Sequence, residues 1–169
     1  MGVYYPGIMM REAIALRPAT DADRDFLYNL HITTMREYIT ATWGWDEAYQ
    51  QRYFNKHFNP AQRLVVVADG VDIGAFWMEI TANEVHLAIL ELAPDYLRQG
   101  IGTHLVGRCI SAARRRGMPE SLLVLRSDTS AQRLYTRLGF RETQDPGVNL
   151  HMMKMTWNPA EPPGNSASP

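Results

Sequence analysis

The chain has 169 residues, a single cysteine and a formal net charge of −1. A chain of this length most often forms one domain with a substantial core. The lone Cys109 excludes a disulfide framework or a thiol-built zinc site within the chain, and the near-zero charge gives no global sign of nucleic-acid binding. No apolar run approaches the roughly 20 residues that cross a membrane, and the N-terminus lacks a signal-peptide pattern. We therefore expect a soluble, cytoplasmic protein that binds neither membrane nor nucleic acid.

The hydrophobic patterns and turn residues predict strands and helices in the order βααβββαβαββ. Alternating or β-branched runs indicate strands, apolar residues at helical spacing indicate helices, and proline and glycine mark the boundaries. The first six elements are predicted over 12–17, 21–39, 47–57, 64–68, 73–80 and 85–92. The remaining five are predicted over 104–117, 121–126, 129–138, 140–143 and 149–157. We expect residues 1–11 to be an N-terminal extension, 12–157 to form the domain, and 158–169 to be a disordered tail.

Several helix starts carry capping signals. Thr20 with Asp23, and Thr129 with Gln132, have the spacing of a capping box. Asp46 is expected to cap the second helix. These signals place the helix boundaries independently of the apolar pattern.

The order of elements predicts an α/β fold with a mixed, mostly antiparallel central sheet flanked by helices. Asp69-Gly70 indicates a hairpin between two strands. The nearly all-apolar run 85–92 is typical of a central strand covered on both faces. The strand, helix and strand that follow one another over 85–126 imply a right-handed parallel crossover.

A glycine-containing loop joins that central strand to the next helix over residues 96–103, with the sequence YLRQGIGT. Such a loop directs unpaired backbone N–H groups toward one point, and the helix dipole adds roughly half a positive charge there. Glycine suits the loop because a Cβ would obstruct a phosphate and because such loops often need φ > 0. The segment therefore predicts an anion site built mostly from backbone.

Two well-known phosphate loops do not fit this segment. A P-loop requires Gly-x-x-x-x-Gly-Lys-Ser/Thr, and no lysine follows the glycines here. A dinucleotide fingerprint requires Gly-x-Gly-x-x-Gly, and after Gly100 and Gly102 its third glycine would fall on Leu105.

Two blocks resemble the GCN5-related N-acetyltransferase superfamily. The first, LELAPDYLRQGIGTHL over 90–105, is similar to the strand and glycine loop of that family's acyl-CoA signature. The second, DTSAQRLYTRLGF over 128–140, resembles the family block Asn-x-x-Ala-x-x-Leu-Tyr-x-x-Leu-Gly-Phe. With its flanking strands the resemblance covers about 12–157. It implies an acyl-CoA N-acyltransferase-like fold and an enzyme that moves an acetyl group from acetyl-CoA directly to a primary amine of a small molecule or peptide.

The resemblance also implies which residues bind acetyl-CoA as cosubstrate. The strand before the loop is expected to splay from its parallel neighbour and to pair through its main chain with the pantetheine arm, with the Leu92 N–H polarising the thioester carbonyl. The implied set is Leu90, Leu92, Arg98, Gln99, Gly100, Ile101, Gly102, Thr103, Asp128, Ser130 and Arg133. The chain departs from the family pattern at Leu97, where Gln or Arg is usual, and at Asp128, where Asn is usual.

Catalytic roles follow from the same resemblance. Tyr135 matches the tyrosine that many members use as general acid toward the coenzyme sulfur. The expected base is His86 on the strand before the loop, placed by period-two spacing on the face of Leu90 and Leu92. An imidazole, with an ordinary pKa of about 6.5, can accept a proton near neutral pH. Glu79 and a water relay are alternatives, and Glu91 is expected on the opposite face.

The acceptor pocket is expected between the first two helices and the last hairpin, over 35–46 and 144–150. Tyr38, Trp43 and Trp45 would form an aromatic wall suited to a cationic amine. No metal is expected, because the histidines show no metal-binding spacing. We expect a monomer or homodimer.

Two other functions remain possible from the sequence. A non-catalytic acyl-CoA-binding or sensor domain of the same fold would be consistent with the departures at Leu97 and Asp128. A nucleotide enzyme would instead be stabilised by ATP or NAD. The sequence does not identify the acceptor, since one fold serves many acceptors.

Overall fold

The structure is a computed structural model that describes residues 14–160. The predicted extension over 1–11, the start of the first predicted strand and most of the predicted tail lie outside the described residues. The helices are α1 (Arg24–Trp43), α2 (Glu47–His57), α3 (Ile101–Arg116) and α4 (Thr129–Arg137). The strands are β1 (Ala15–Pro18), β2 (Leu64–Ala68), β3 (Val71–Ile80), β4 (Val85–Leu92), β5 (Glu120–Leu125), β6 (Arg141–Thr143) and β7 (Met152–Trp157). The predicted order of strands and helices is confirmed.

Residues 14–160 contain one seven-stranded sheet, in the order β1-β2-β3-β4-β5-β7-β6. Neighbouring strands are antiparallel except β4 and β5, which are parallel and joined through α3. The mixed, mostly antiparallel sheet predicted from the sequence is therefore confirmed. Within residues 14–160, no helix combines the length and apolarity that a membrane span requires.

Two apolar clusters cover the two faces of the sheet. On one face, α3 and α4 pack against β2 to β5 around Phe76, Leu105 and Leu122. On the other face, α1 and α2 pack against β2, β3 and β4 through residues such as Leu27 and Phe54. Alternation along β2 and β3 explains the division, because successive side chains of a strand point to opposite faces.

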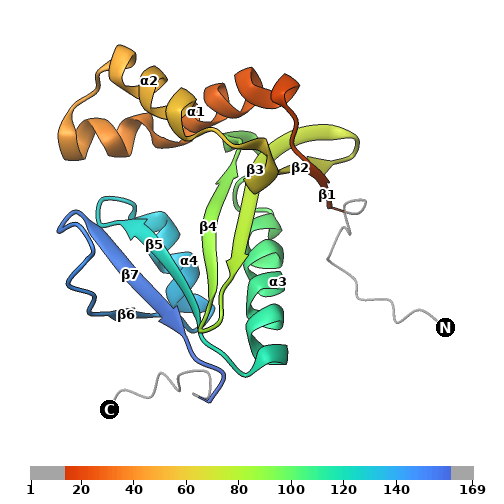
Figure 1. Ribbon diagram of the computed structural model, residues 1–169, viewed down its shortest axis with the longest axis vertical. Helices are drawn as coiled ribbons and strands as arrows, with labels where there is room; N and C mark the ends of the chain where they lie inside the picture. The colour runs from red at the N-terminus through yellow and green to blue at the C-terminus, as the bar shows by residue number, and fades with distance from the viewer. Residues whose placement is uncertain (1–13, 161–169) are drawn as a thin grey trace.

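The central parallel strands separate along their length. β4 and β5 pair only at Val85–Glu120, His86–Ser121 and Leu87–Leu122. In Figure 1 the two strands meet at the bottom of the view and diverge upward, toward α1. This splay is the feature expected from the family resemblance, and it leaves the β5-facing side of β4 without a strand partner beyond Leu87.

A β-bulge in β4 corrects the predicted position of His86. Met78 of β3 opposes Leu87 and Trp77 opposes Ile89, so Ala88 is an extra residue in β4. A bulge breaks the strict alternation of a strand. Leu87 and the residues after the bulge at 90 and 92 therefore share the face of α3 and α4. His86 points to the other face, and the period-two prediction that it shares a face with Leu90 and Leu92 is wrong.

Two helix boundaries also differ from the predictions. α1 continues to Trp43, past the expected end near 39, so Tyr38 and Trp43 lie on a helix and not in an interhelical loop. Gly44, with φ of 79°, ends it by donating its N–H to the Thr40 carbonyl. α3 begins at Ile101, so the second glycine of the loop lies in its first turn.

The cap of α4 is Asp128 and not the predicted pair of Thr129 and Gln132. The Asp128 carboxylate accepts from the Ala131 N–H at 2.9 Å. The Gln132 amide instead donates to the Leu125 carbonyl at 2.9 Å. The reason is that the residue before the threonine already has a short acidic side chain, which caps better than a threonine one position later. The predicted caps at Thr20 and Asp46 are confirmed.

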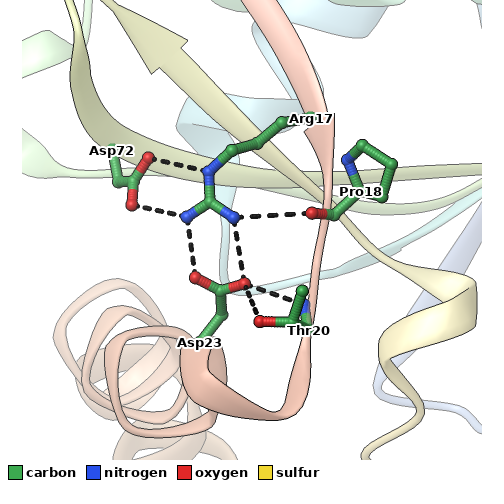
Figure 2. A network of polar contacts seen from close by, with 5 residues as sticks. All are labelled: Arg17, Pro18, Thr20, Asp23 and Asp72. Atoms are coloured by element: carbon green, nitrogen blue, oxygen red, sulfur yellow. Dashed lines mark hydrogen bonds and ion pairs between the residues drawn. The ribbon is translucent and has the colours of Figure 1, made fainter.

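Arg17 fastens the first strand to two other elements (Figure 2). Its guanidinium donates to both carboxylate oxygens of Asp23, at 3.0 and 2.7 Å, and of Asp72, at 3.2 and 2.6 Å. Asp23 also accepts from the Thr20 N–H at 2.8 Å. One side chain thus links β1, the first helical turn and β3 by charge-assisted bonds.

Candidate active site

The glycine loop forms a backbone cradle at the start of α3. Arg98 and Gly100 both have left-handed backbones, with φ of 58° and 82°. No side chain caps α3, so the N–H groups of its first turn, at Ile101, Gly102 and Thr103, have no partner in the helix. The positive end of the helix dipole lies at the same point. The segment can therefore hold an anion through main-chain donors.

The side chains around this loop offer fewer groups for binding an anion than its backbone does. Leu97 stands in solvent, with 51% of its surface exposed. The Gln99 amide donates to the Asp95 carbonyl at 2.6 Å and so braces the loop. Among the polar loop residues, Arg98 and the exposed Thr103 are the candidates for a side-chain contact with an anion.

Gly102 fixes where the cradle lies in the fold. A Cβ at this position would approach the Leu134 side chain to 3.3 Å and that of Leu92 to 4.0 Å. The first turn of α3 therefore rests between the end of β4 and α4. Ser130 and Arg133 are exposed on α4. The cradle opens where the splay between β4 and β5 is widest.

Tyr135 lies on α4 against the core. Its ring packs on Phe140, with centroids 5.8 Å apart, and the residue is 8% exposed. Burial, followed by the nearby Asp128 and Glu120 carboxyls, raises the pKa of the phenol. Its hydroxyl has no hydrogen-bond partner within residues 14–160 and is not sealed from solvent. The Tyr135 phenol therefore keeps its proton and can donate a hydrogen bond to a bound ligand.

His86 lies in the last rows where β4 and β5 are still paired. Its Nδ1 is 2.9 Å from the Oγ of Ser121, its register partner on β5. Its partner on the other side is Glu79 of β3, which is exposed. Two of the bases considered from the sequence are therefore cross-strand neighbours on the α1 face of the sheet. Glu91 is on this face too.

Helix α1 bridges the open end of the splay. At one edge His31 contacts Glu91 of β4, with Nδ1 2.8 Å from Oε1. At the other edge Thr42 contacts Ser127, which follows β5, with the two hydroxyl oxygens 3.3 Å apart. Sequence reasoning missed His31 and Ser121, because their partners are 60 and 35 residues away and no local motif marks them.

The three aromatic residues predicted to form one wall do not all lie together. Tyr38 lies near the Asp128 carboxylate, and burial, followed by that charge, raises the pKa of its phenol. Trp43 is 53% exposed and packs edge-to-face on His151, which precedes β7, with centroids 5.5 Å apart. Trp45 belongs to another cluster, where its Nε1 donates to Glu47 at 2.9 Å. Arg36 covers the Trp45 ring at 5.0 Å.

The model of the acetyltransferase (GNAT) family matches residues 24–140, more than half of the chain. This chain belongs to the GNAT acetyltransferase family. The match includes both blocks on which the resemblance rested, together with α1, the splayed strands and Tyr135.

Two curated relatives are mycothiol acetyltransferases. The chain is 31% identical over 87 residues to that of Clavibacter sepedonicus and 30% identical over 87 residues to that of Clavibacter michiganensis subsp. michiganensis. Each match covers 50% of this chain, but only 29% and 28% of the two relatives. The chain thus matches less than a third of their length.

Solved structures share the fold at low identity. PaiA N-acetyltransferase from Thermoplasma acidophilum, in complex with coenzyme A, has a TM-score of 0.68 at 19% identity, over 86% of this chain and 99% of that one. The ribosomal-protein-S18-alanine N-acetyltransferase of Escherichia coli has a TM-score of 0.60 at 17% identity, over 92% and 99%. An acetyltransferase from Thermus thermophilus has a TM-score of 0.65 at 16% identity, over 88% and 99%.

The GNAT domain brings most of the sequence-predicted residues to one splay. The loop and first-turn residues line its open end, and Tyr135 is on the α3 and α4 face. His86 lies at its closed end on the α1 face. Asp128 serves as a helix cap, and Trp45 lies apart from the other two aromatic residues. Within residues 14–160, no group of three His, Cys, Asp or Glu side chains is placed to hold a metal ion.

Proposed function

We propose that this GNAT protein is an acetyl-CoA-dependent N-acetyltransferase acting on a primary amine of a small molecule or peptide. The splay between β4 and β5 carries the proposal, because it opens next to an uncapped helix start. An extended thioester arm fits beside an unpaired strand edge, and a pyrophosphate fits a cradle of backbone N–H groups.

In this proposal the chain binds acetyl-CoA mainly through its backbone. The N–H groups at 98–103 hold the pyrophosphate, with Arg98 adding a cation. The main chain of Leu90 and Leu92 pairs with the pantetheine arm, and the Leu92 N–H polarises the thioester carbonyl. Ser130 and Arg133, both exposed on α4, contact the phosphate or nucleotide portion. The backbone geometry supports this, since it needs no side chain at Leu97.

The proposed chemistry is direct transfer. The amine nitrogen forms a bond to the thioester carbonyl carbon and loses a proton to His86 through a chain of waters, because His86 and Leu92 are six residues apart along β4. The carbon–sulfur bond breaks, and the Tyr135 hydroxyl gives its proton to the departing sulfur. Glu79, opposite His86 on β3, is the alternative base. The amine enters from the α1 face, where Tyr38 and Trp43 lie toward the last hairpin.

A non-catalytic acyl-CoA-binding domain is the second candidate. It is favoured by Asp128, whose carboxylate caps α4 and, unlike the amide of an asparagine, has no N–H to donate to a cofactor. It is also favoured by the exposed Leu97, which offers no polar group to a phosphate. The uncommitted Tyr135 hydroxyl and the His86 imidazole favour the enzyme.

The deciding experiment combines binding with turnover. Thermal unfolding is followed with acetyl-CoA, CoA, ATP and NAD, and thiol release is followed over amines, amino acids, polyamines, aminoglycosides and peptides. We expect stabilisation by acetyl-CoA and CoA together with turnover on at least one amine. Stabilisation without turnover would favour the binding domain. Stabilisation by ATP or NAD alone would overturn both readings.

A further inference from the structure

Ser121 is a fully buried hydroxyl bonded to the imidazole of His86. The Ser121 side chain has 0% of its surface exposed, and its Oγ is 2.9 Å from the His86 Nδ1. Within the part of the chain that the structure describes, His86 is the hydrogen-bond partner of this hydroxyl. A buried hydroxyl without a partner is costly, so the contact holds both side chains in place.

The pair sits immediately below the point where the strands diverge. Leu87 and Leu122 form the last paired row of β4 and β5, one residue beyond His86 and Ser121. Above this row the α1 face is open, since Leu123 is 45% exposed and the bulge residue Ala88 is also exposed. The imidazole Nε2 has no protein partner within residues 14–160. It is therefore the ring nitrogen available to accept a proton.

The hydroxyl can serve both protonation states of the ring. A serine donates to a bare Nδ1 or accepts from a protonated one. A ring that takes a proton at Nε2 must carry hydrogen on Nδ1, and Ser121 Oγ then accepts that hydrogen. When the ring becomes an imidazolium, the same bond becomes charge-assisted and stronger. The contact thus stabilises the state after proton transfer more than the state before it, which is the condition for accelerating the step.

We propose that Ser121 is the positioning residue for His86, which it orients with Nε2 toward the splay and supports as Nε2 takes the proton of the acceptor amine. The proposal rests on the proposed function. Ser121 does not touch either substrate in this scheme, because it is fully buried beneath the imidazole.

Other charged groups surround the ring and must be kept constant in a test. Glu79 faces it from β3. Glu84, before β4, lies 3.9 Å from the Nζ of Lys154 on β7. Farther along β4, Glu91 is engaged by His31. A substitution at Ser121 leaves all of these charges in place, so a change in pH dependence reports the lost hydroxyl.

Ser121→Ala is the direct test, and Thr156→Val is its matched control. Thr156 is the register partner of Ser121 on β7, and its hydroxyl bonds Thr143 at 2.8 Å, away from the imidazole. We expect Ser121→Ala to lower kcat about 3- to 30-fold, with KM for acetyl-CoA within about twofold. The rising limb of the pH–rate profile should move to lower pH. Thr156→Val should change neither.

A double substitution and an NMR titration decide between positioning and packing. In a His86→Ala background, Ser121→Ala should have almost no further effect on kcat. An equal fold-loss in both backgrounds, or an unmoved rising limb, would overturn the proposal. If the wild-type protein turns over no amine, the proposed function fails instead, and the pairing of Ser121 with His86 is judged by ¹⁵N NMR. The His86 ring should then titrate at lower pH in Ser121→Ala than in Thr156→Val, and equal midpoints would reject this pairing.

Discussion

At the scale of single residues, a substitution at Tyr135 distinguishes a catalytic role of this side chain from a packing role. Phenylalanine keeps the ring contact with Phe140 but removes the proton that the sulfur would take. Because burial raises the pKa of Tyr135, the wild-type phenol keeps its proton throughout neutral pH. We expect Tyr135→Phe to lower kcat roughly 100-fold with acetyl-CoA affinity nearly unchanged, measured by steady-state kinetics and calorimetry. A variant at full rate would show that Tyr135 only packs.

Glu120 should make stability depend on pH. Its carboxyl is fully buried beside the Cys109 thiol, yet neither oxygen has a hydrogen-bond partner of good geometry among the described residues. Burial raises its pKa to about 8. Between the ordinary value, about 4.3, and that value, the folded state binds a proton that the unfolded state has lost. The free energy of unfolding therefore falls as pH rises, by up to about 1.4 kcal/mol per pH unit.

Glu120→Gln removes this titration while keeping the shape of the side chain. We expect urea unfolding to give similar free energies for the two proteins near pH 4 and a growing advantage of the variant up to pH 8, of about one to a few kcal/mol. Other titrating groups cancel in the difference. Parallel curves for the two proteins would mean that Glu120 does not hold its proton in the folded state.

At the scale of elements, β3 approaches β4 too closely for a side chain at Gly74. A Cβ there would lie 2.5 Å from the Glu91 carbonyl oxygen and 2.7 Å from the Leu92 side chain. We expect Gly74→Ala to destabilise the fold by about 1–3 kcal/mol and to weaken acetyl-CoA binding, because the strand end proposed to hold the pantetheine must shift. Thermal unfolding and calorimetry measure both effects.

Gly107→Ala is the matched control for the crowding at Gly74. A Cβ at the half-buried Gly107 of α3 would meet nothing within 4 Å. Alanine favours a helix over glycine by about 1 kcal/mol, so this variant should be slightly stabilised with unchanged binding. If Gly74→Ala behaved in the same way, the close approach of the two strands would not be a constraint.

At the scale of the whole molecule, Arg17 joins β1 and the first helical turn to β3, where its partner Asp72 is 55 residues away. The Asp23 carboxylate is largely buried, and its hydrogen bonds from Arg17 foremost hold its pKa well below the usual range. A depressed pKa gives stability that is present above about pH 4, the unfolded value, and is lost as pH falls toward the folded one. Acid should therefore loosen β1 from the first helical turn.

We expect Asp23→Asn to lower the free energy of unfolding by about 1–3 kcal/mol at pH 7, with the difference from wild type shrinking below about pH 4. Asp72→Asn removes the more exposed partner of the same guanidinium and should cost at most about 1 kcal/mol. Urea unfolding at pH 3, 5 and 7 measures both. An Asp23→Asn deficit that is equal at all three pH values would contradict the assignment.

The local parts of the fold were predictable because their causes are local. Periodicity, turn residues and caps gave the order of strands and helices, and Asp46 and the Asp69-Gly70 turn behave as expected. One prediction is wrong because two possible caps, Asp128 and Thr129, are adjacent in the sequence. Another is wrong because the apolar helical pattern of α1 stops near residue 39, whereas the helix continues to its stop at Gly44. The two family blocks placed Gly100 and Tyr135 without any knowledge of packing.

The sequence by itself determined the family, the element order and the glycine loop, because these depend on neighbours along the chain. Only the tertiary structure decided the face of His86, since the bulge at Ala88 arises from pairing with β3. The contact between His86 and Ser121 joins residues 35 apart, and it depends on the parallel register of two strands. Such contacts follow from how elements pack together, which no local pattern in the sequence specifies.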